Sequence, residues 1–245
     1  ELRLMARQDV SLEIHSLWKG SKNWEGHTVH HFRHRYLLKL IWELPRWMLK
    51  RPAVLRSVLQ RLYQHDIGSL QNLGELLVGL GFGLVMAGHF RKTAPHLIHG
   101  VWATMPATAA WLLNKLTDIP YSMGAHAYDV FRHGGDCLLP AKVASASLIH
   151  TTTEATRRRL LEIGAHPERI VLIRRGLDRF PTCRPLRRNP TPLRLLSVGR
   201  RVPKKGFSNQ LIILAALKQA GVPFEAHIVG EGPLMASLVQ LRDKL

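Results

Sequence analysis

Two cationic side chains, each beside a glycine, form the pattern in this chain that points most directly to chemistry. Arg200 follows Gly199, and Lys205, five residues beyond Arg200, precedes Gly206. A guanidinium offers a rigid fork of donors to phosphate oxygens, and an ammonium offers a movable point charge. The pair therefore predicts a site that binds a diphosphate.

The residues around this pair predict the elements that position it. Residues 193–198 form a short apolar run, which is typical of a buried parallel strand. After the turn, apolar residues recur with helical spacing at Phe207, Leu211, Leu214 and Leu217. Ligands of open α/β sheets bind at the carboxyl ends of the strands, and the start of a helix offers unpaired N–H groups to an anion. The predicted strand, turn and helix thus place both cations where a diphosphate would bind.

A second turn, Gly230-Glu231-Gly232-Pro233, follows another predicted strand near residues 224–229. The two turns together resemble the nucleotide-sugar-binding half of the retaining GT-B glycosyltransferases, in the large group 1 or family four class that includes exopolysaccharide and colanic-acid-type enzymes. The resemblance implies that Arg200 and Lys205 bind the donor diphosphate, with Gly199 in support. It also implies a nucleotide pocket lined by Gly230, Glu231 and Gly232.

His126 is the candidate catalytic residue. Strands are predicted near residues 97–101, 120–124 and 148–151, and His126 stands just past the second of them, with Asp129 close by. The stretch from His99 to Phe131 resembles the same glycosyltransferases, in which the histidine of this loop faces the donor sugar. The resemblance implies a catalytic role for His126, and we expect Asp129 to orient or stabilise the loop. The alternative is an ordinary structural histidine, because the chain has 14 of them.

The alternation of strands and helices predicts the fold class: an α/β GT-B fold in which two Rossmann-like domains, each with a parallel sheet, face a cleft. Residues 1–181 would form the N-terminal acceptor-side domain, incomplete and with a basic helical region at 33–92. Residues 182–192, rich in proline and arginine, read as a linker. Residues 193–245 would begin the nucleotide-sugar-binding domain.

Residues 33–61 carry eight Lys and Arg side chains against one acid, Glu43. Aromatic and aliphatic residues are interleaved with them, and Pro45 and Pro52 predict a break into short helices. One interpretation is a solvated helix face over ordinary core. Another is contact with an anionic membrane surface, where each cation contributes about 1 kcal/mol. Nucleic acid is the least favoured partner.

Two further patterns could be mistaken for a membrane span and for a metal site. The charge-free stretch at 76–88 is shorter than the roughly 20 apolar residues of a membrane span. We therefore predict a buried helix whose glycines allow close helix packing. The histidines His27, His30 and His34 could share a helix face and bind a metal, but no carboxylate or thiolate in the tract completes the set. We expect neither a metal nor another cofactor in the reaction.

The composition agrees with an enzyme of anionic substrates. The 245 residues include 35 Lys and Arg against 17 Asp and Glu, a net charge of +18, which calls for an anionic neighbour. Two cysteines form no disulfide framework, so a reducing cytosol is expected. We expect a cytoplasmic protein, peripheral at the inner face of the membrane.

The sequence thus favours an enzyme that moves a sugar from a nucleotide-sugar donor to a saccharide or lipid-linked acceptor in surface polysaccharide synthesis. The resemblance implies retention of the anomeric configuration. The alternatives are a non-catalytic basic module that binds membrane or nucleic acid, and a GT-B nucleotide-sugar epimerase. The chain opens at Glu1 in what reads as the middle of a helix and stops at Leu245 in another. We expect an internal fragment, truncated at both ends and inactive by itself.

Overall fold

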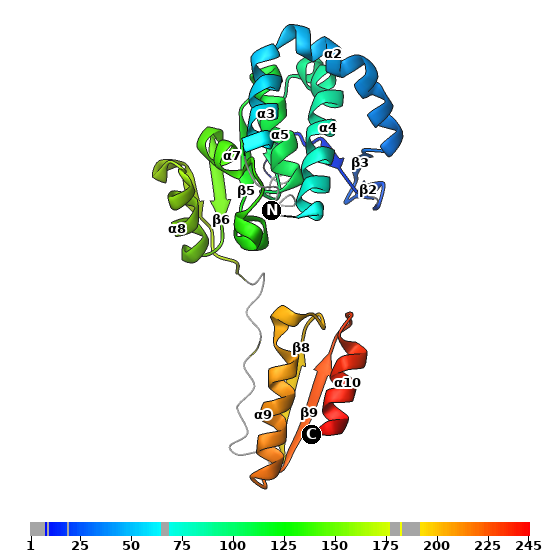
Figure 1. The fold of residues 1–245 in the computed structure, drawn as a ribbon, viewed down its shortest axis with the longest axis vertical. Coiled ribbons are helices and arrows are strands. Elements are labelled where there is room, and N and C mark those ends of the chain that lie inside the picture. Colours follow the sequence, from blue (N-terminus) through cyan, green and yellow to red (C-terminus); the bar gives the residue numbers. More distant parts are fainter. Residues whose placement is uncertain (1–7, 9, 19, 65–68, 177–181, 183–191) are drawn as a thin grey trace. The chain divides into compact units, whose positions relative to one another are not determined.

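The computed structural model describes residues 8, 10–18, 20–64, 69–176, 182 and 192–245 (Figure 1). The chain divides into two compact units, Glu1–Leu177 and Asp178–Leu245. The start of the chain, residues 1–7, where a helix is expected, and most of the expected linker, residues 183–191, lie outside the described residues.

The first unit contains a four-stranded parallel sheet. Its strands are β4 (Ile98–Gly100), β5 (Tyr121–Gly124), β6 (Leu148–Thr151) and β7 (Ile170–Leu172), in spatial order β4-β5-β6-β7. Helices and turns connect them: α5 (Met105–Thr117), α6 (Tyr128–Phe131), η2 (Arg132–Gly134), α7 (Leu139–Ser145), α8 (Glu154–Ile163) and η3 (Pro167–Arg169). β5 is buried along its whole length, and β4 and β6 are mostly buried, as is typical of strands in a parallel sheet. The parallel α/β architecture predicted for this half of the chain is confirmed.

The core of the first unit forms where α4 (Leu70–Thr93) packs against α5. A Cβ atom on Gly79 would lie 2.7 Å from the carbonyl oxygen of Met105, and one on Gly83 would lie 2.9 Å from Cδ2 of Leu112. Only glycine allows the two helix backbones to approach so closely, so the predicted glycine packing is confirmed. By length and composition alone α4 could cross a membrane, and 56% of its most apolar stretch is buried within the structure.

The basic region forms three short helical segments: η1 (His34–Lys39), α2 (Leu40–Lys50) and α3 (Pro52–Gln64). The prediction that Pro52 begins a new helix is confirmed, but the prediction that Pro45 breaks one is wrong, because Pro45 lies inside α2. Proline removes the hydrogen bond to the carbonyl of residue 41, and its ring crowds that carbonyl, but the helix continues through it. Ile41 is 65% exposed, so this part of α2 lies at the surface.

The N-terminal region forms a small sheet of β1 (Ile14–Ser16), β2 (Asn23–Trp24) and β3 (His27–His31), in the order β1-β3-β2. β3 pairs in parallel with β1 and antiparallel with β2. The histidine-rich tract is therefore a strand, and a shared helix face for its histidines is wrong. Side chains alternate along a strand, so His27 and His30 lie on opposite faces.

The second unit contains a parallel pair of strands, β8 (Leu193–Val198) and β9 (Phe224–Val229), as predicted. The turn after β8 contains η4 (Pro203–Lys205) and leads into α9 (Phe207–Gln219). A final helix, α10 (Met235–Lys244), follows β9. Gly206 joins η4 to α9 with a φ of +69°, a left-handed conformation that favours glycine.

Candidate functional site

The turns that follow β8 and β9 lie against each other. The backbone N–H of Gly199 donates to the carbonyl of Val229 at 2.9 Å, and the N–H of Arg201 donates to the carbonyl of Glu231 at 2.7 Å. A Cβ atom on Gly230 would stand 2.1 Å from the carbonyl oxygen of Gly199. Glycine is therefore required for this backbone approach, and the two predicted turns meet at one rim of the sheet.

Positive charge gathers at the same rim. Arg200 and Lys205 are both exposed, and neither forms an ion pair with any described residue. Lys205 ends η4, directly before Gly206 and the first turn of α9. No described side chain caps the start of α9, so its N–H groups and partial positive charge add to the two cations. This arrangement suits an anion with several oxygens.

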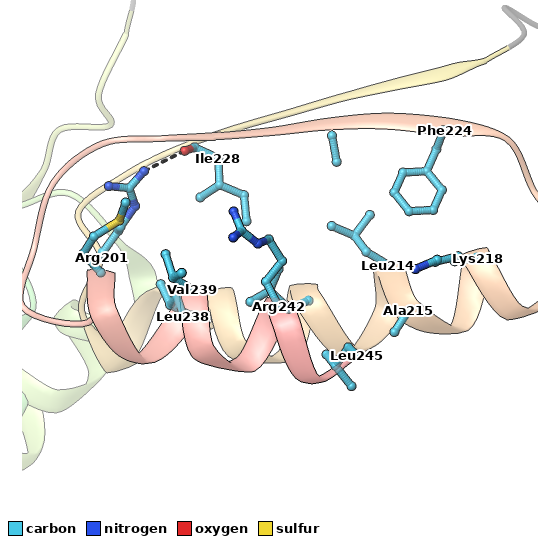
Figure 2. Close-up of a pocket in the computed structure, with 13 residues that line it drawn as sticks. Arg201, Leu214, Ala215, Lys218, Phe224, Ile228, Leu238, Val239, Arg242 and Leu245 are labelled. Carbon is cyan, nitrogen blue, oxygen red and sulfur yellow. Dashed lines mark hydrogen bonds between the residues drawn. The ribbon is translucent and has the colours of Figure 1, made fainter.

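The neighbouring Arg201 has a different environment. Its Nη2 atom donates to the carbonyl oxygen of Ile228 at 2.9 Å, as Figure 2 shows. Arg201 also lines a groove of about 380 Å³ in the second unit, between α9 and α10. Leu214, Phe224 and Leu238 make the groove mostly apolar. None of the predicted site residues lines it, so this groove is separate from the predicted diphosphate site.

In the first unit, the loop after β5 holds His126 from several sides. The N–H of His126 donates to the Asp129 carboxylate at 3.1 Å, and its carbonyl accepts a hydrogen bond from the Thr156 hydroxyl. The imidazole ring contacts the rings of Trp102 and His150, with centroid distances of 5.3 and 4.8 Å. The ring thus has a defined position at the carboxyl end of the sheet. Sequence reasoning singled out neither of these ring partners.

Asp129 connects two loops of this rim. It is 2% exposed, and its carboxylate also accepts from the N–H groups of Ala127 at 2.9 Å and Ala103 at 3.1 Å. Ala103 follows β4, whereas Ala127 follows β5. A carboxylate that accepts several backbone hydrogen bonds holds those segments together. This geometry is what a loop-stabilising residue needs.

A buried ion pair lies beside Asp129. Lys142 is fully buried, and its Nζ atom contacts the carboxylate of Asp136, the hydroxyl of Thr108 at 3.1 Å and the carbonyl of Ala103. Both backbone groups of Ala103 are therefore hydrogen-bonded: its N–H donates to Asp129, and its carbonyl accepts from Lys142. This pair was not predictable from the sequence, because a lysine on a short helix is normally exposed.

Two groups in this region have shifted acidities. Burial raises the pKa of the Cys137 thiol, and the adjacent Asp136 carboxylate raises it further. Burial also raises the pKa of Tyr121, whose hydroxyl donates to the carbonyl of Lys142. Both side chains therefore stay protonated at neutral pH, and neither has the character of a nucleophile or base.

The predicted residues thus form two groups. Arg200, Lys205 and the turn at Gly230–Gly232 meet in the second unit, and His126 and Asp129 meet in the first. The expectation that both groups face one cleft stays a prediction.

Comparisons with known proteins point to one class. The profile of the family described as Glycosyltransferase Family 4 matches residues 57–179. Two curated relatives, both named WcaL and assigned as colanic acid biosynthesis glycosyltransferases, come from Escherichia coli strain K12 and Salmonella typhimurium strain LT2. Each is 39% identical over 77 residues, which is 31% of this chain and 19% of the relative. The matched segment thus spans about a fifth of these relatives.

Among solved structures, the chain is similar to the apo form of WaaB, a lipopolysaccharide outer core galactosyltransferase. The TM-score is 0.50 at 13% identity, and the similarity covers 69% of this chain and 46% of that chain. At this identity the likeness bears on the fold alone.

Proposed function

The chain belongs to Glycosyltransferase Family 4. We propose that it contributes binding and catalytic residues to an enzyme that transfers a sugar from a nucleotide-sugar donor to a saccharide or lipid-linked acceptor. Its fold is of the α/β GT-B class. The pathway we propose is the synthesis of a surface polysaccharide, as the WcaL relatives are assigned to colanic acid biosynthesis. The observation that carries the proposal is the meeting of the Arg200–Lys205 turn with the Gly230–Gly232 turn at one sheet rim.

The rim would bind the donor's diphosphate. As the sugar departs, negative charge grows on the leaving diphosphate, and the donors that meet that charge lower the barrier. Arg200, Lys205 and the start of α9 offer such donors, each charge-assisted hydrogen bond contributing about 1.5–3 kcal/mol. We propose that these groups replace a metal ion in the reaction, and that Gly230, Glu231 and Gly232 line the nucleotide pocket.

His126 would face the sugar. Its backbone is held by Asp129 and Thr156 and its ring by Trp102 and His150, so the imidazole is positioned before any substrate binds. Preorganised polar groups are those that stabilise a transition state most effectively. We propose that His126 contacts the donor sugar while Asp129 orients its loop, and that the anomeric configuration is retained.

The basic region would contact the membrane that carries a lipid-linked acceptor. Leu38, Ile41, Trp42, Met48 and Leu49 form an exposed apolar stripe on η1 and α2, and Trp42 is 79% exposed. Cations stand along the same helices, including Lys39, Arg46 and Lys50. Exposed apolar side chains beside cations suit an anionic lipid surface. We propose that the enzyme acts in the cytoplasm, peripheral at the inner face of the membrane.

The diphosphate role is tested by calorimetric titration of the chain with UDP and with GDP. We expect Arg200→Ala or Lys205→Ala to weaken binding of the preferred nucleotide at least 10-fold, since each removes a charge-assisted bond. Lys218→Ala is the matched control, because it removes a charge at the other end of α9. Equal affinity of all three variants for the nucleotide would contradict the proposed site.

The reaction is tested separately, by incubating a full-length enzyme that contains this chain with a panel of nucleotide sugars, with and without saccharide acceptors. The chain by itself is the comparison and should transfer no sugar. Transfer that depends on acceptor and is lost in His126→Ala supports the proposal. An epimerised nucleotide sugar formed without acceptor would point to an epimerase instead.

A further inference from the structure

A cluster of metal-ligating side chains in the first unit includes none of the proposed site residues. Oε1 of Glu13 accepts hydrogen bonds from Nε2 of His15 at 2.9 Å and from Nε2 of His89 at 2.7 Å. The ligand atoms of the three side chains all lie within 4.8 Å of one another. Two imidazoles therefore converge on a single carboxylate oxygen, although His89 is 76 residues from Glu13 in the chain.

The elements explain why these side chains meet. Glu13 and His15 are two residues apart along β1 and its entry, so both project from the same face of that strand. His89 comes from the C-terminal part of α4 and lies over that face, with its ring 5.9 Å from the ring of His15. The cluster therefore bridges the small N-terminal sheet and the main helix of the first unit.

A fourth imidazole stands beside the cluster. His30 on β3 is the register partner of His15 on β1, so their side chains share one face of the sheet, and their ring centroids are 5.3 Å apart. Phe82 and Phe90 also contact the ring of His15, at centroid distances of 5.7 and 5.3 Å. An apolar wall beside polar ligands is a usual surrounding of a metal site.

We propose that Glu13, His15 and His89 bind one divalent transition-metal ion, with His30 as the fourth ligand. Imidazole nitrogens and a carboxylate oxygen select zinc-like ions over magnesium or calcium. In a tetrahedral zinc site with bonds of about 2.0–2.2 Å, ligand atoms lie about 3.3–3.5 Å apart. The Nε2 atoms, now 2.9 and 2.7 Å from Oε1, need to move away from it by about 0.4–0.8 Å to reach that spacing.

The ion has a structural role. It replaces the hydrogen bonds within the cluster by metal–ligand bonds and fastens β1 and β3 to α4. This site is independent of the sugar-transfer reaction, for which no metal is proposed.

The test uses the whole chain, stripped with EDTA and titrated with Co²⁺, whose visible absorption distinguishes tetrahedral from octahedral coordination. We expect one Co²⁺ per chain with intense absorption of the tetrahedral kind, displaced by one equivalent of Zn²⁺. Glu13→Gln and His89→Gln should each weaken Co²⁺ binding at least 10-fold. Both positions are more than a third exposed, and glutamine keeps a hydrogen-bonding group in place, so both variants should fold.

The matched control is His27→Gln, on the same strand as His30 but on the opposite face, and it should bind Co²⁺ as the parent does. Circular dichroism of each apo variant verifies its folding. Octahedral absorption, unchanged affinity in Glu13→Gln and His89→Gln, or an equal loss in His27→Gln would overturn the proposal, since binding would then come from other histidines.

Discussion

At the scale of single residues, Lys142 joins two loops through one buried charge. It contacts the carboxylate of Asp136 and the carbonyl of Ala103, and the Asp129 carboxylate accepts a hydrogen bond from the N–H of the same alanine. Removing one member of a buried ion pair leaves the other charged and unpaired, which is costlier than losing the attraction itself.

We therefore expect Lys142→Met to lower the free energy of unfolding by about 3–5 kcal/mol. Urea denaturation of the chain, followed by circular dichroism, measures this change. Arg159→Ala removes an exposed partner of Glu162 and serves as the control, with an expected loss below about 1 kcal/mol. Similar losses in the two variants would show that Lys142 is not held as the structure indicates.

Cys137 provides a second prediction at this scale. Because burial and the charge of Asp136 raise the pKa of its thiol, less of the reactive thiolate is present at a given pH than in an unfolded chain. Alkylation by iodoacetamide should therefore be slower in the native protein, and its rate should still rise with pH where the unfolded thiol has reached its plateau. Mass spectrometry of the Cys137 peptide measures both rates. Identical pH profiles would exclude a raised pKa.

Residue types alone could not predict which of two adjacent arginines faces a ligand. The motif spacing identified Arg200, and the structure shows that Arg201 is instead bound to the carbonyl of Ile228. The strand, turn and helix around Arg200 were predictable because they are consecutive in sequence, whereas binding of a diphosphate by Arg200 stays a prediction. The environment of His126 was not predictable in this way, because Trp102 follows β4 and His150 lies on β6, the two strands on either side of β5.

At the scale of elements, the contact between α4 and α5 depends on two glycines. We expect Gly79→Ala to destabilise the chain by about 1–3 kcal/mol, because its Cβ atom would overlap the backbone carbonyl of Met105. Gly74→Ala on the same helix has no atom within 4 Å of the new Cβ and should be neutral or more stable by up to about 1 kcal/mol. Thermal unfolding of both variants measures the contrast, and a stabilised Gly79→Ala protein would contradict this packing.

Elements with regular local patterns were predictable, whereas those that depend on distant contacts were not. The strands at 193–198 and 224–229 follow from apolar runs between turn residues. The tract at 27–31 lacks such a pattern, and it is a strand because β1 and β2 pair with it on either side. The cluster of Glu13 with His89 had no signal in the sequence, because it joins a strand to a helix far along the chain.

At the scale of the whole molecule, a net charge of +18 gives long-range attraction to any polyanion at low salt. Affinity for anionic vesicles should therefore fall steeply between about 0.05 M and about 0.5 M salt, as the screening length shortens. Burial of the exposed apolar stripe in the lipid adds to the free energy of vesicle binding, and salt does not screen this contribution. Trp42→Ala with Leu49→Ala should weaken vesicle binding at both salt concentrations.

Vesicle sedimentation measures this binding, and Leu196→Ala is the control, since Leu196 is 70% exposed but lies on β8 in the second unit. Binding that depends on salt alone, with the stripe variant equal to the parent, would show electrostatic adsorption without insertion. Equal loss in Leu196→Ala would show that the stripe has no special role.

The packing of α4 on α5 also sets how fast backbone amide hydrogens exchange with the solvent. The middle of α4, from Leu80 to Val85, is buried throughout, and its amides are engaged in a continuous helix. Such amides exchange only when the surrounding structure opens cooperatively. Deuterium uptake in this segment therefore reports the opening of the first unit under native conditions, without denaturant.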